Sequence, residues 1–317
     1  ALHCQLLSEL VEEVWLADVD RDRVRSVAEQ FDVRPAEDTS EILATCDALV
    51  ITAATSAHAD LIIEGVDAGL PTFCEKPIAL DLPMTRKVVD HVEANDGRVQ
   101  VGFQRRFDRG FVEARRLIAS GELGTLFVIR MAGHDPDPPH EEYIPESGGM
   151  FRDFSIHDFD ALHFVTGDEV VEVYATGSVR AYPIFEKYGD IDTGTAILTL
   201  RSGAQGILSC TRRHPFGYDI RMELFGSDDS GVVGWDDRTP LRSLEPDGPR
   251  LPDNPYQNFQ DRFRPAYAAE LAAFVEYTAG RRENPCTVHD AEQALRVAVA
   301  CDLSRVEHRP VRLEEVA

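Results

Sequence analysis

The stretch ALVITAATSAHADLIIEGVDAGLPTFCE at residues 48–75 decides the fold of this chain. An apolar run at 48–54 is followed by a helical pattern at 58–69 and then by a second apolar run at 71–75. Buried strands that alternate with helices of about a dozen residues are typical of a parallel sheet covered on both faces. The stretch therefore predicts a β–α–β unit of a doubly wound α/β fold.

The same alternation continues on both sides of this unit. An apolar run at 14–19 precedes a helical pattern at 21–31, while a helical pattern at 82–96 precedes an apolar run at 98–103. Ligands of such folds bind at the carboxyl ends of the strands. We therefore predict that residues 1–103 form a Rossmann-type dinucleotide-binding domain.

Asp18 closes the strand predicted at 14–19. In a dinucleotide-binding fold, an acidic residue there accepts hydrogen bonds from the ribose hydroxyls and repels a 2′-phosphate, which favours NAD over NADP. The alternative is an ordinary turn residue at a strand end. The phosphate-binding turn G-x-G-x-x-G is missing from the sequence, and it belongs before this strand. We therefore expect the Rossmann domain to lack its first strand and glycine-rich loop, and the native protein to be longer by about fifteen to twenty residues.

The pattern changes after residue 103. A helical pattern at 111–123 leads into segments in which apolar and polar residues alternate, at 125–133, 170–179, 192–203, 204–213 and 219–229. Such alternation predicts a large, open-faced, mostly antiparallel sheet with one covered face. A polar, proline-rich surface loop is expected at 244–258, and two helices at 267–280 and 288–306 complete the chain. Residues 104–317 are thus predicted to form an α+β domain for substrate binding and oligomerisation, with the open sheet as an interface.

Composition narrows the class of protein. The 317 residues are 43% hydrophobic, and the net charge is −24. Such a charge argues against nucleic-acid and anionic-membrane partners and fits a neutral or cationic small substrate. Six scattered cysteines show no zinc-like or disulfide-like spacing, so we expect no metal. Because no eighteen-residue apolar run and no signal peptide are present, we expect a cytoplasmic protein.

Lysine is rare in this chain. Of the 32 basic residues only three are lysines, Lys76, Lys87 and Lys187, so 29 are arginines. Lysine can lose its proton and arginine cannot. Lys76 directly follows the strand predicted at 71–75, which indicates a functional amine at the ligand-binding edge of the sheet.

A second candidate site lies in SGGMFRDFSIHDFDALHFVTG, residues 147–167, which we predict as one helix ending at Gly167. Asp153 and His157 are four residues apart and so one turn apart, and Asp160 lies on nearly the same stripe. A carboxylate beside an imidazole orients it and raises its basicity. The alternative is a surface Asp–His pair.

Four segments carry a resemblance to a known family. They are CEKPIAL (74–80), VGFQRRFD (101–108), SGGMFRDFSIHDFD (147–160) and TRRHPFGYDIRMELFGS (211–227). Together they resemble the Gfo/Idh/MocA oxidoreductases, and the chain is most similar to the inositol 2-dehydrogenases. The resemblance covers essentially the whole chain in the right order.

The resemblance implies an NAD-dependent dehydrogenase that takes a hydride from a secondary hydroxyl of a cyclic polyol or sugar, with myo-inositol as the leading candidate. It places Lys76 near the reacting hydroxyl, and we assign His157 as the general base and Asp153 as its orienting partner. An NAD-dependent glycoside hydrolase of the same superfamily is an alternative. So is a non-catalytic protein that binds a dinucleotide or a sugar.

Further residues follow from the same resemblance. The substrate hydroxyls are expected to contact Arg106, Asp135 and Tyr218, and the cofactor Asp18, His58, Glu75 and Lys76. Arg106, Asp135 and Tyr218 are alternatively loop or structural ion-pair residues, and His58 a helix-start residue. His134 stands where related sequences often have Arg, and Gln104 where Asn is commoner, which bears on the substrate. The family resemblance also suggests a homotetramer.

Overall fold

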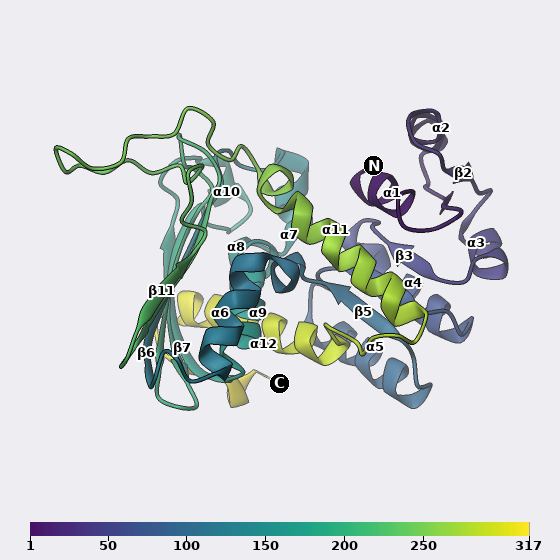
Figure 1. The fold of residues 1–317 in the computed structure, drawn as a ribbon. Helices are drawn as coiled ribbons and strands as arrows, with labels where there is room; N and C mark the ends of the chain where they lie inside the picture. Colours follow the sequence, from purple (N-terminus) through teal and green to yellow (C-terminus); the bar gives the residue numbers. More distant parts are fainter. Residues whose placement is uncertain (317) are drawn as a thin grey trace. The chain divides into compact units, whose positions relative to one another are not determined.

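The computed structural model describes residues 1–316 of the chain. It divides into two compact units (Figure 1). Unit 1 comprises residues 1–104 and 265–292, and unit 2 comprises residues 105–264 and 293–317. The chain passes between the units within two long helices, α11 (Phe259–Thr278) and α12 (Val288–Glu307).

Unit 1 contains the predicted β–α–β pattern. Strands β3, β4 and β5 pair in parallel, and β1 pairs in parallel with β2. The parallel sheet predicted from the sequence is therefore confirmed. The elements of this part of the chain are α1 (Leu2–Leu7), β1 (Trp15–Leu16), α2 (Arg21–Gln30), β2 (Arg34–Pro35), α3 (Thr39–Thr45), β3 (Leu49–Ile51), α4 (Thr55–Asp67), β4 (Thr72–Glu75), α5 (Leu82–Ala94) and β5 (Val99–Gly102).

Local sequence explains where these elements begin and what they bury. Asp20 and Asp81 precede α2 and α5, and their carboxylates accept hydrogen bonds from backbone N–H groups of the first helical turn. Phe73 on β4, Ile62 on α4 and Val88 on α5 are fully buried. Helix and strand thus share one apolar core, which fixes the carboxyl end of β4 and the residues that follow it.

Unit 2 is built on a mixed sheet. In the part of the chain that the structure describes, the sheet has seven strands in the order β11-β10-β6-β9-β8-β7-β12. Neighbouring strands run antiparallel except β6 and β9, which run parallel in the middle of the sheet. The strands are β6 (Leu126–His134), β7 (Val170–Ser178), β8 (Thr193–Leu200), β9 (Gln205–Thr211), β10 (Asp219–Gly226), β11 (Ser230–Val233) and β12 (Val311–Arg312).

One face of this sheet is covered and the other is open. Helices α6 (Arg109–Ala119) and α9 (Ile156–Thr166) lie on the same side of the strands (Figure 1). Ile129 and Met131 on β6 are buried on the covered face, whereas Ile197 and Ile207 on the next strands are about half exposed on the open one. The alternating pattern in the sequence predicted this arrangement. The remaining short helices of the described chain are η1 (Gln104–Phe107), η2 (Glu141–Tyr143), α10 (Ile184–Lys187) and η3 (Leu313–Glu315).

The predicted single helix at 147–167 is wrong. The segment contains the end of α7 (Ile144–Ser147), then α8 (Met150–Asp153), and then α9. Gly148 and Gly149 have φ values of 82° and 96°, in the left-handed region, and therefore separate α7 from α8. The predicted end at Gly167 is confirmed, because this residue has φ 65° and follows the last turn of α9.

A second interruption separates α8 from α9. The N–H of Ser155 donates to the carbonyl of Met150, five residues back, rather than to the residue four back. The carbonyl of Ser155 then accepts from the N–H groups of Asp158 and Phe159, which starts a new helical ladder. Neither Gly nor Pro marks this point, so the sequence pattern could not reveal it.

The last part of the chain differs from the prediction in one boundary. Helix α11 begins at Phe259, eight residues before the predicted start, and contains Pro265. Its first turn is supported by Asn258, whose side chain accepts the N–H of Asp261. The surface loop predicted at 244–258 is confirmed, with Leu244 87% exposed. Across residues 1–316, the helices are all too short or too polar to cross a membrane.

Candidate active site

A buried charged cluster lies at one end of the unit 2 sheet. Asp135 directly follows β6, and Arg212 directly follows β9. Because these strands are parallel neighbours, their carboxyl ends meet, and the N–H of Asp135 donates to the carbonyl of Thr211 at 2.9 Å. The Arg212 guanidinium, 4% exposed, donates through Nη1 to Asp135 Oδ2 at 2.9 Å.

The same guanidinium binds a second carboxylate. Arg212 Nη2 donates to Asp153 Oδ2 at 2.6 Å, and the hydroxyl of Tyr143 donates to Asp153 Oδ1 at 2.9 Å. The guanidinium carbon also lies 4.9 Å from the centre of the Phe154 ring. Asp153 is thus held through both of its oxygens. We call Asp135, Tyr143, Asp153 and Arg212 the covered-face cluster.

Two carboxylates share one guanidinium in this cluster. Burial raises the pKa of Asp135, and the charge of Arg212 opposes that shift. Burial likewise raises the pKa of Tyr143, to which the neighbouring Asp153 carboxylate adds, so the phenol keeps its proton and donates. Although burial disfavours the charged guanidinium, Asp153 and Asp135 outweigh it and raise the pKa of Arg212. Within these four residues one guanidinium therefore donates to two carboxylates.

His157 lies close to this cluster along the chain. It is the second residue of α9 and is half-buried, whereas Asp153 is the last residue of α8. Because the two residues belong to different helices, the argument from one continuous turn was wrong. The roles assigned to the pair remain predictions.

A deeper layer of buried ion pairs holds two of the predicted substrate residues. Arg106 donates to Asp160 through Nε and Nη2, with Nη2 2.6 Å from Oδ1. Tyr218 is 5% exposed, and its hydroxyl interacts with Arg105, which also binds Asp158. Burial raises the pKa of Tyr218. These contacts position both residues within the covered side of unit 2, and their contact with substrate remains a prediction.

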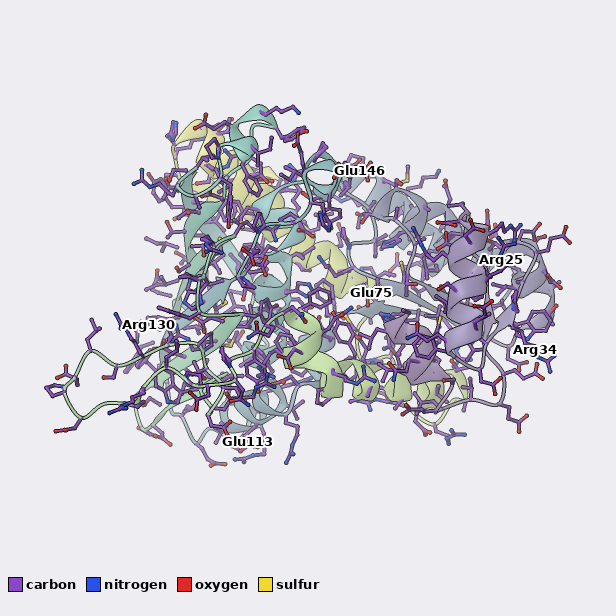
Figure 2. The ribbon with its side chains drawn as sticks, turned by 90° about the horizontal axis from the view of Figure 1, so that it is seen from above. Arg25, Arg34, Glu75, Glu113, Arg130 and Glu146 are labelled. Carbon is purple, nitrogen blue, oxygen red and sulfur yellow. The ribbon has the colours of Figure 1, made fainter. Side chains whose placement is uncertain are left out.

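In unit 1, the predicted residues at the end of β4 have identifiable partners. Glu75 is the last residue of β4 (labelled in Figure 2), and its Oε1 lies 2.8 Å from Nε2 of His3. Lys76 follows it, and the Lys76–Pro77 peptide bond is cis. His58 lies inside α4 and is 2% exposed, with Nδ1 2.7 Å from the carbonyl oxygen of Pro77.

The other ring nitrogen of His58 also has a carbonyl partner. Its Nε2 lies 3.0 Å from the oxygen of Ala53, in the loop that follows β3. Either tautomer therefore finds an acceptor, and the imidazole ties the loop after Lys76 to the end of β3. His58 is not a helix-start residue, because α4 begins three residues earlier, at Thr55.

Asp18 lies beyond β1, as the sequence predicted. Its carboxylate accepts the N–H of Asp20 at 2.9 Å and pairs with Nη1 of Arg23 at 3.2 Å. The Arg23 side chain is 65% exposed, and Arg25 and Arg34 also reach the surface of unit 1 (Figure 2). The carboxylate still has lone pairs for ribose hydroxyls. The positive charge of the neighbouring Arg23 guanidinium opposes the repulsion between Asp18 and a 2′-phosphate.

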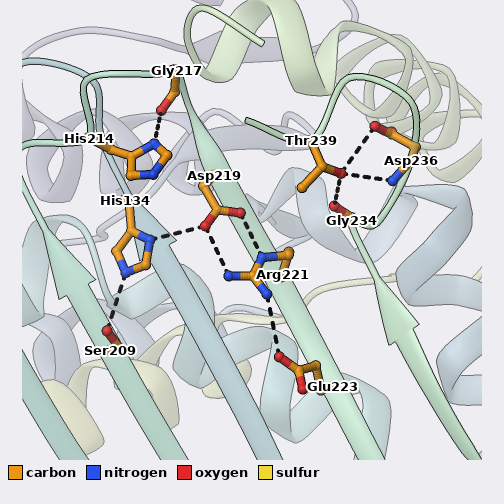
Figure 3. Close-up of polar contacts among 10 residues, drawn as sticks. All are labelled: His134, Ser209, His214, Gly217, Asp219, Arg221, Glu223, Gly234, Asp236 and Thr239. Atoms are coloured by element: carbon orange, nitrogen blue, oxygen red, sulfur yellow. Dashed lines mark hydrogen bonds and ion pairs between the residues drawn. The ribbon is translucent and has the colours of Figure 1, made fainter. Parts of the chain in front are cut away.

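A second polar cluster lies on the open face of the sheet (Figure 3). His134 Nδ1 lies 3.1 Å from Asp219 Oδ2, and its Nε2 lies 3.2 Å from the Ser209 hydroxyl. Arg221 Nε donates to Asp219 Oδ1 at 2.8 Å. Burial alone would raise the pKa of Asp219, but hydrogen bonds from His134 and Arg221 lower it to about 2. We call His134, Ser209, Asp219 and Arg221 the open-face cluster.

Sequence reasoning missed Arg212 and Tyr143. Arg212 stands in a quoted motif, TRRHPFGYD, but only the parallel pairing of β6 with β9 brings it to Asp135, and alternation of residues does not reveal pairing. Tyr143 comes from a proline-rich segment without periodicity. A signal was available in Arg212, because a strand-end arginine next to a buried strand requires a carboxylate partner.

Comparison with known proteins identifies the family. The model of an oxidoreductase family with an NAD-binding Rossmann fold matches residues 3–103, and that of the GFO/IDH/MocA C-terminal domain matches residues 111–231. The chain is 34% identical to the myo-inositol 2-dehydrogenase of Thermotoga maritima, over 99% of this chain and 96% of that protein.

Solved structures agree over nearly the full length. A myo-inositol dehydrogenase from Corynebacterium glutamicum superimposes with a TM-score of 0.89 at 32% identity, covering 98% of this chain and 95% of that one. A scyllo-inositol dehydrogenase from Lactobacillus casei, with bound NAD(H) and scyllo-inositol, gives a TM-score of 0.88 at 26% identity, covering 99% of this chain and 95% of that one. The protein therefore belongs to the Gfo/Idh/MocA family, as an NAD-dependent dehydrogenase with an N-terminal Rossmann domain followed by a mixed, mostly antiparallel open sheet.

Proposed function

We propose that this protein oxidises a secondary hydroxyl of a cyclic polyol, with myo-inositol as the leading substrate and a sugar as the next candidate. The observation that carries the proposal is the buried carboxylate pair of Asp135 and Asp153, with His157 four residues after Asp153, in a chain similar to inositol dehydrogenases over its length. Carboxylates accept hydrogen bonds from hydroxyl groups, and several such acceptors are needed to replace the water around a polyol.

The reaction removes a proton from oxygen and a hydride from carbon. NAD supplies the hydride acceptor when it is bound. We assign His157 to take the hydroxyl proton and Asp153 to stabilise the resulting imidazolium. Lys76 of unit 1 is assigned as the cation that stabilises negative charge developing on the substrate oxygen.

The proposed substrate contacts differ in accessibility. The side chain of Asp135 is 18% exposed, that of Arg106 is 6% exposed, and Tyr218 is 5% exposed as a residue. Asp135 is therefore the most direct candidate for binding a hydroxyl. The more buried Arg106 and Tyr218 are proposed to contact further substrate hydroxyls. Because a substrate carboxylate would face the carboxylates of Asp135 and Asp153, we expect sugar acids to be poor substrates.

Residues of the first 103 positions are proposed to hold the cofactor, and residues 104–317 the substrate. The Asp18 carboxylate suits ribose hydroxyls, because two of its contacts are used and further lone pairs remain. Glu75 and His58 fix the loop that carries Lys76. This donor and acceptor set fits NAD.

The decisive experiment follows absorbance of NADH. The protein is mixed with NAD or NADP and with a panel of inositol isomers, aldoses and sugar acids. NADH formation with an inositol supports the proposal, and its absence with every polyol and sugar contradicts it. Release of an aryl aglycone without accumulating NADH supports the glycoside hydrolase alternative, while NAD binding without any turnover supports a binding protein. Faster turnover with NADP than with NAD refutes the role of Asp18.

Two substitutions test the assigned residues. Lys76→Ala and His157→Ala should each lower kcat/KM by about a hundredfold or more, because each group handles charge or a proton in the transition state. Lys87→Ala and His289→Ala change the same residue types at exposed positions and should leave kcat/KM unchanged. Equal effects of a test variant and its control would return the test residue to a structural role.

We also propose that the protein is a homotetramer and that the open sheet face is one of its interfaces. Tyr174, Ile197 and Ile207 lie side by side in register on β7, β8 and β9, and they are 42%, 52% and 41% exposed. An apolar row of this kind is costly to leave in water. Light scattering should give a tetramer for the native chain and smaller species after Ile197→Glu with Ile207→Glu. A native monomer contradicts this proposal.

A further inference from the structure

We propose that Arg212 is a positioning residue for the reaction, which holds Asp135 and Asp153 as two ionised carboxylates at a fixed separation. The inference rests on the proposed function, since it gives both carboxylates work in that reaction. Arg212 itself contacts neither reacting atom in this assignment.

The geometry requires a forked cation at this position. Nη1 reaches Asp135 after β6, and Nη2 reaches Asp153 at the end of α8, at 2.9 and 2.6 Å. Between Asp135 and Asp153 the chain forms η2 and α7 and then passes through Gly148 and Gly149. A planar guanidinium can donate to both at once in fixed directions, whereas a lysine ammonium is a single point of charge on a flexible stem.

The electrostatics require a cation as well. Asp135 faces Arg212, Asp153 and Arg105, and burial already raises its pKa. Asp153 faces Arg212 and the Tyr143 hydroxyl, and Tyr143 in turn also faces Glu146. Without the guanidinium each of the two carboxylates would lose a charged donor, and the pKa of each would rise.

Protonation would weaken what the reaction needs. A protonated Asp135 is a weaker hydrogen-bond acceptor for a substrate hydroxyl than its carboxylate, and Asp153 stabilises an imidazolium only as an anion. Loss of Arg212 removes an interaction that lowers the pKa of Asp135, so this pKa rises further. The acid limb of the activity profile should therefore move to higher pH.

The next residue provides a matched control. Arg213 pairs with Asp137, two residues after Asp135, and its Nη1 lies 2.7 Å from Asp137 Oδ1. The Arg213 side chain is 46% exposed. An exposed pair of this kind contributes little, because water screens it. Arg213→Met therefore makes the same chemical change beside the cluster without entering it.

The experiment measures kcat/KM from pH 5 to pH 9 for the full chain with NAD and the best substrate of the panel. Arg212→Met should lower kcat/KM by about a hundredfold at pH 7 and shift the acid limb upward by about one pH unit. Arg212→Lys should keep the acid limb nearer its native position, because it keeps the positive charge. Its kcat/KM should still fall by at least about tenfold, because an ammonium cannot donate to both carboxylates in fixed directions. Arg213→Met should stay within about twofold of the native chain.

A second readout needs no substrate. Removal of Arg212 should make the unfolding free energy of Arg212→Met fall more steeply between pH 5 and pH 8 than that of the native chain, because a raised carboxylate pKa destabilises the fold as pH rises. If Arg212→Met does not fold, Arg212→Lys still tests the inference through kcat/KM. An unshifted acid limb or an unchanged stability slope in Arg212→Met, or native kcat/KM in Arg212→Lys, overturns the inference. If the native chain forms no NADH, the proposed function is refuted instead. The pH dependence of the unfolding free energy of Arg212→Met then still tests whether Arg212 keeps the two carboxylates ionised.

Discussion

The covered-face and open-face clusters lie at the same end of one sheet and each pairs an arginine with an aspartate, yet the pKa values of their aspartates shift in opposite directions. His134 and Asp135 are consecutive, and successive side chains at a strand end point to opposite faces. On the open face Asp219 pairs with both His134 and Arg221, and Arg221 also contacts Glu223 at 3.4 Å (Figure 3). On the covered face two carboxylates share Arg212.

The pKa values follow from that difference. Hydrogen bonds lower the pKa of Asp219 to about 2, although its side chain is buried. The pKa of Asp135 is raised, because burial outweighs a guanidinium that it shares with Asp153. A carboxylate whose pKa is lowered by its hydrogen bonds contributes to stability, whereas one whose pKa is raised beside a shared guanidinium is left able to bind a hydroxyl donor or support a proton acceptor. The open-face cluster is therefore expected to stabilise the fold and the covered-face cluster to serve the chemistry.

The largest expected effect is a difference in kcat between a substitution in the covered-face cluster and the same substitution in the open-face cluster. Asp153→Asn should lower kcat by about a hundredfold or more, because a neutral amide cannot stabilise a protonated His157. Asp219→Asn makes the same change on the open face and should leave kcat within about twofold. Steady-state rates of NADH formation at saturating substrate give both values. Similar losses in the two variants would remove the distinction between the clusters.

The next effect separates the clusters by stability. The pKa of Asp219 is depressed from 3.8 to about 2, so its contribution is present above pH 3.8 and is lost as pH falls through about 2. At 1.36 kcal/mol per pKa unit this contribution is about 2 kcal/mol. Asp219→Asn should lower the unfolding free energy by that amount at pH 7, and the difference should vanish near pH 2.

The covered face should show the opposite sign. The raised pKa of Asp135 means that its ionised form opposes folding at neutral pH. Asp135→Asn should therefore leave the unfolding free energy at pH 7 unchanged or higher, while it lowers kcat/KM. Guanidinium chloride unfolding at several pH values measures both variants, and destabilisation by Asp135→Asn would contradict the assignment.

The sequence predicted the elements of this fold better than their pairing. Alternating apolar residues located the strands β6 to β10 and the open face, since a half-buried strand leaves a period of two in the sequence. Nothing in that period shows that β6 pairs in parallel with β9, and this pairing alone joins Asp135 to Arg212. The break at Ser155 also left no signal, because it arises from a change in backbone hydrogen bonding between residues that favour helix.

The smallest effect removes one hydroxyl from each cluster. The Tyr143 hydroxyl donates to Asp153 Oδ1 at 2.9 Å, and the Ser209 hydroxyl lies 3.2 Å from His134 Nε2. A hydrogen bond to a charged group contributes about 1.5 kcal/mol or more, which corresponds to about a tenfold change in rate if it is needed in the transition state. Tyr143→Phe should therefore lower kcat/KM by about tenfold, since Asp153 keeps Arg212 but loses its second donor.

Ser209→Ala should leave kcat/KM unchanged and cost about 1 kcal/mol of stability or less, because His134 retains Asp219 as its partner. Parallel measurement of kcat/KM and of unfolding free energy in both variants decides the point. If Ser209→Ala lowers turnover as much as Tyr143→Phe does, the open face contributes to catalysis through β6. If neither variant lowers turnover, the Tyr143 hydroxyl is not needed to orient Asp153 for the reaction.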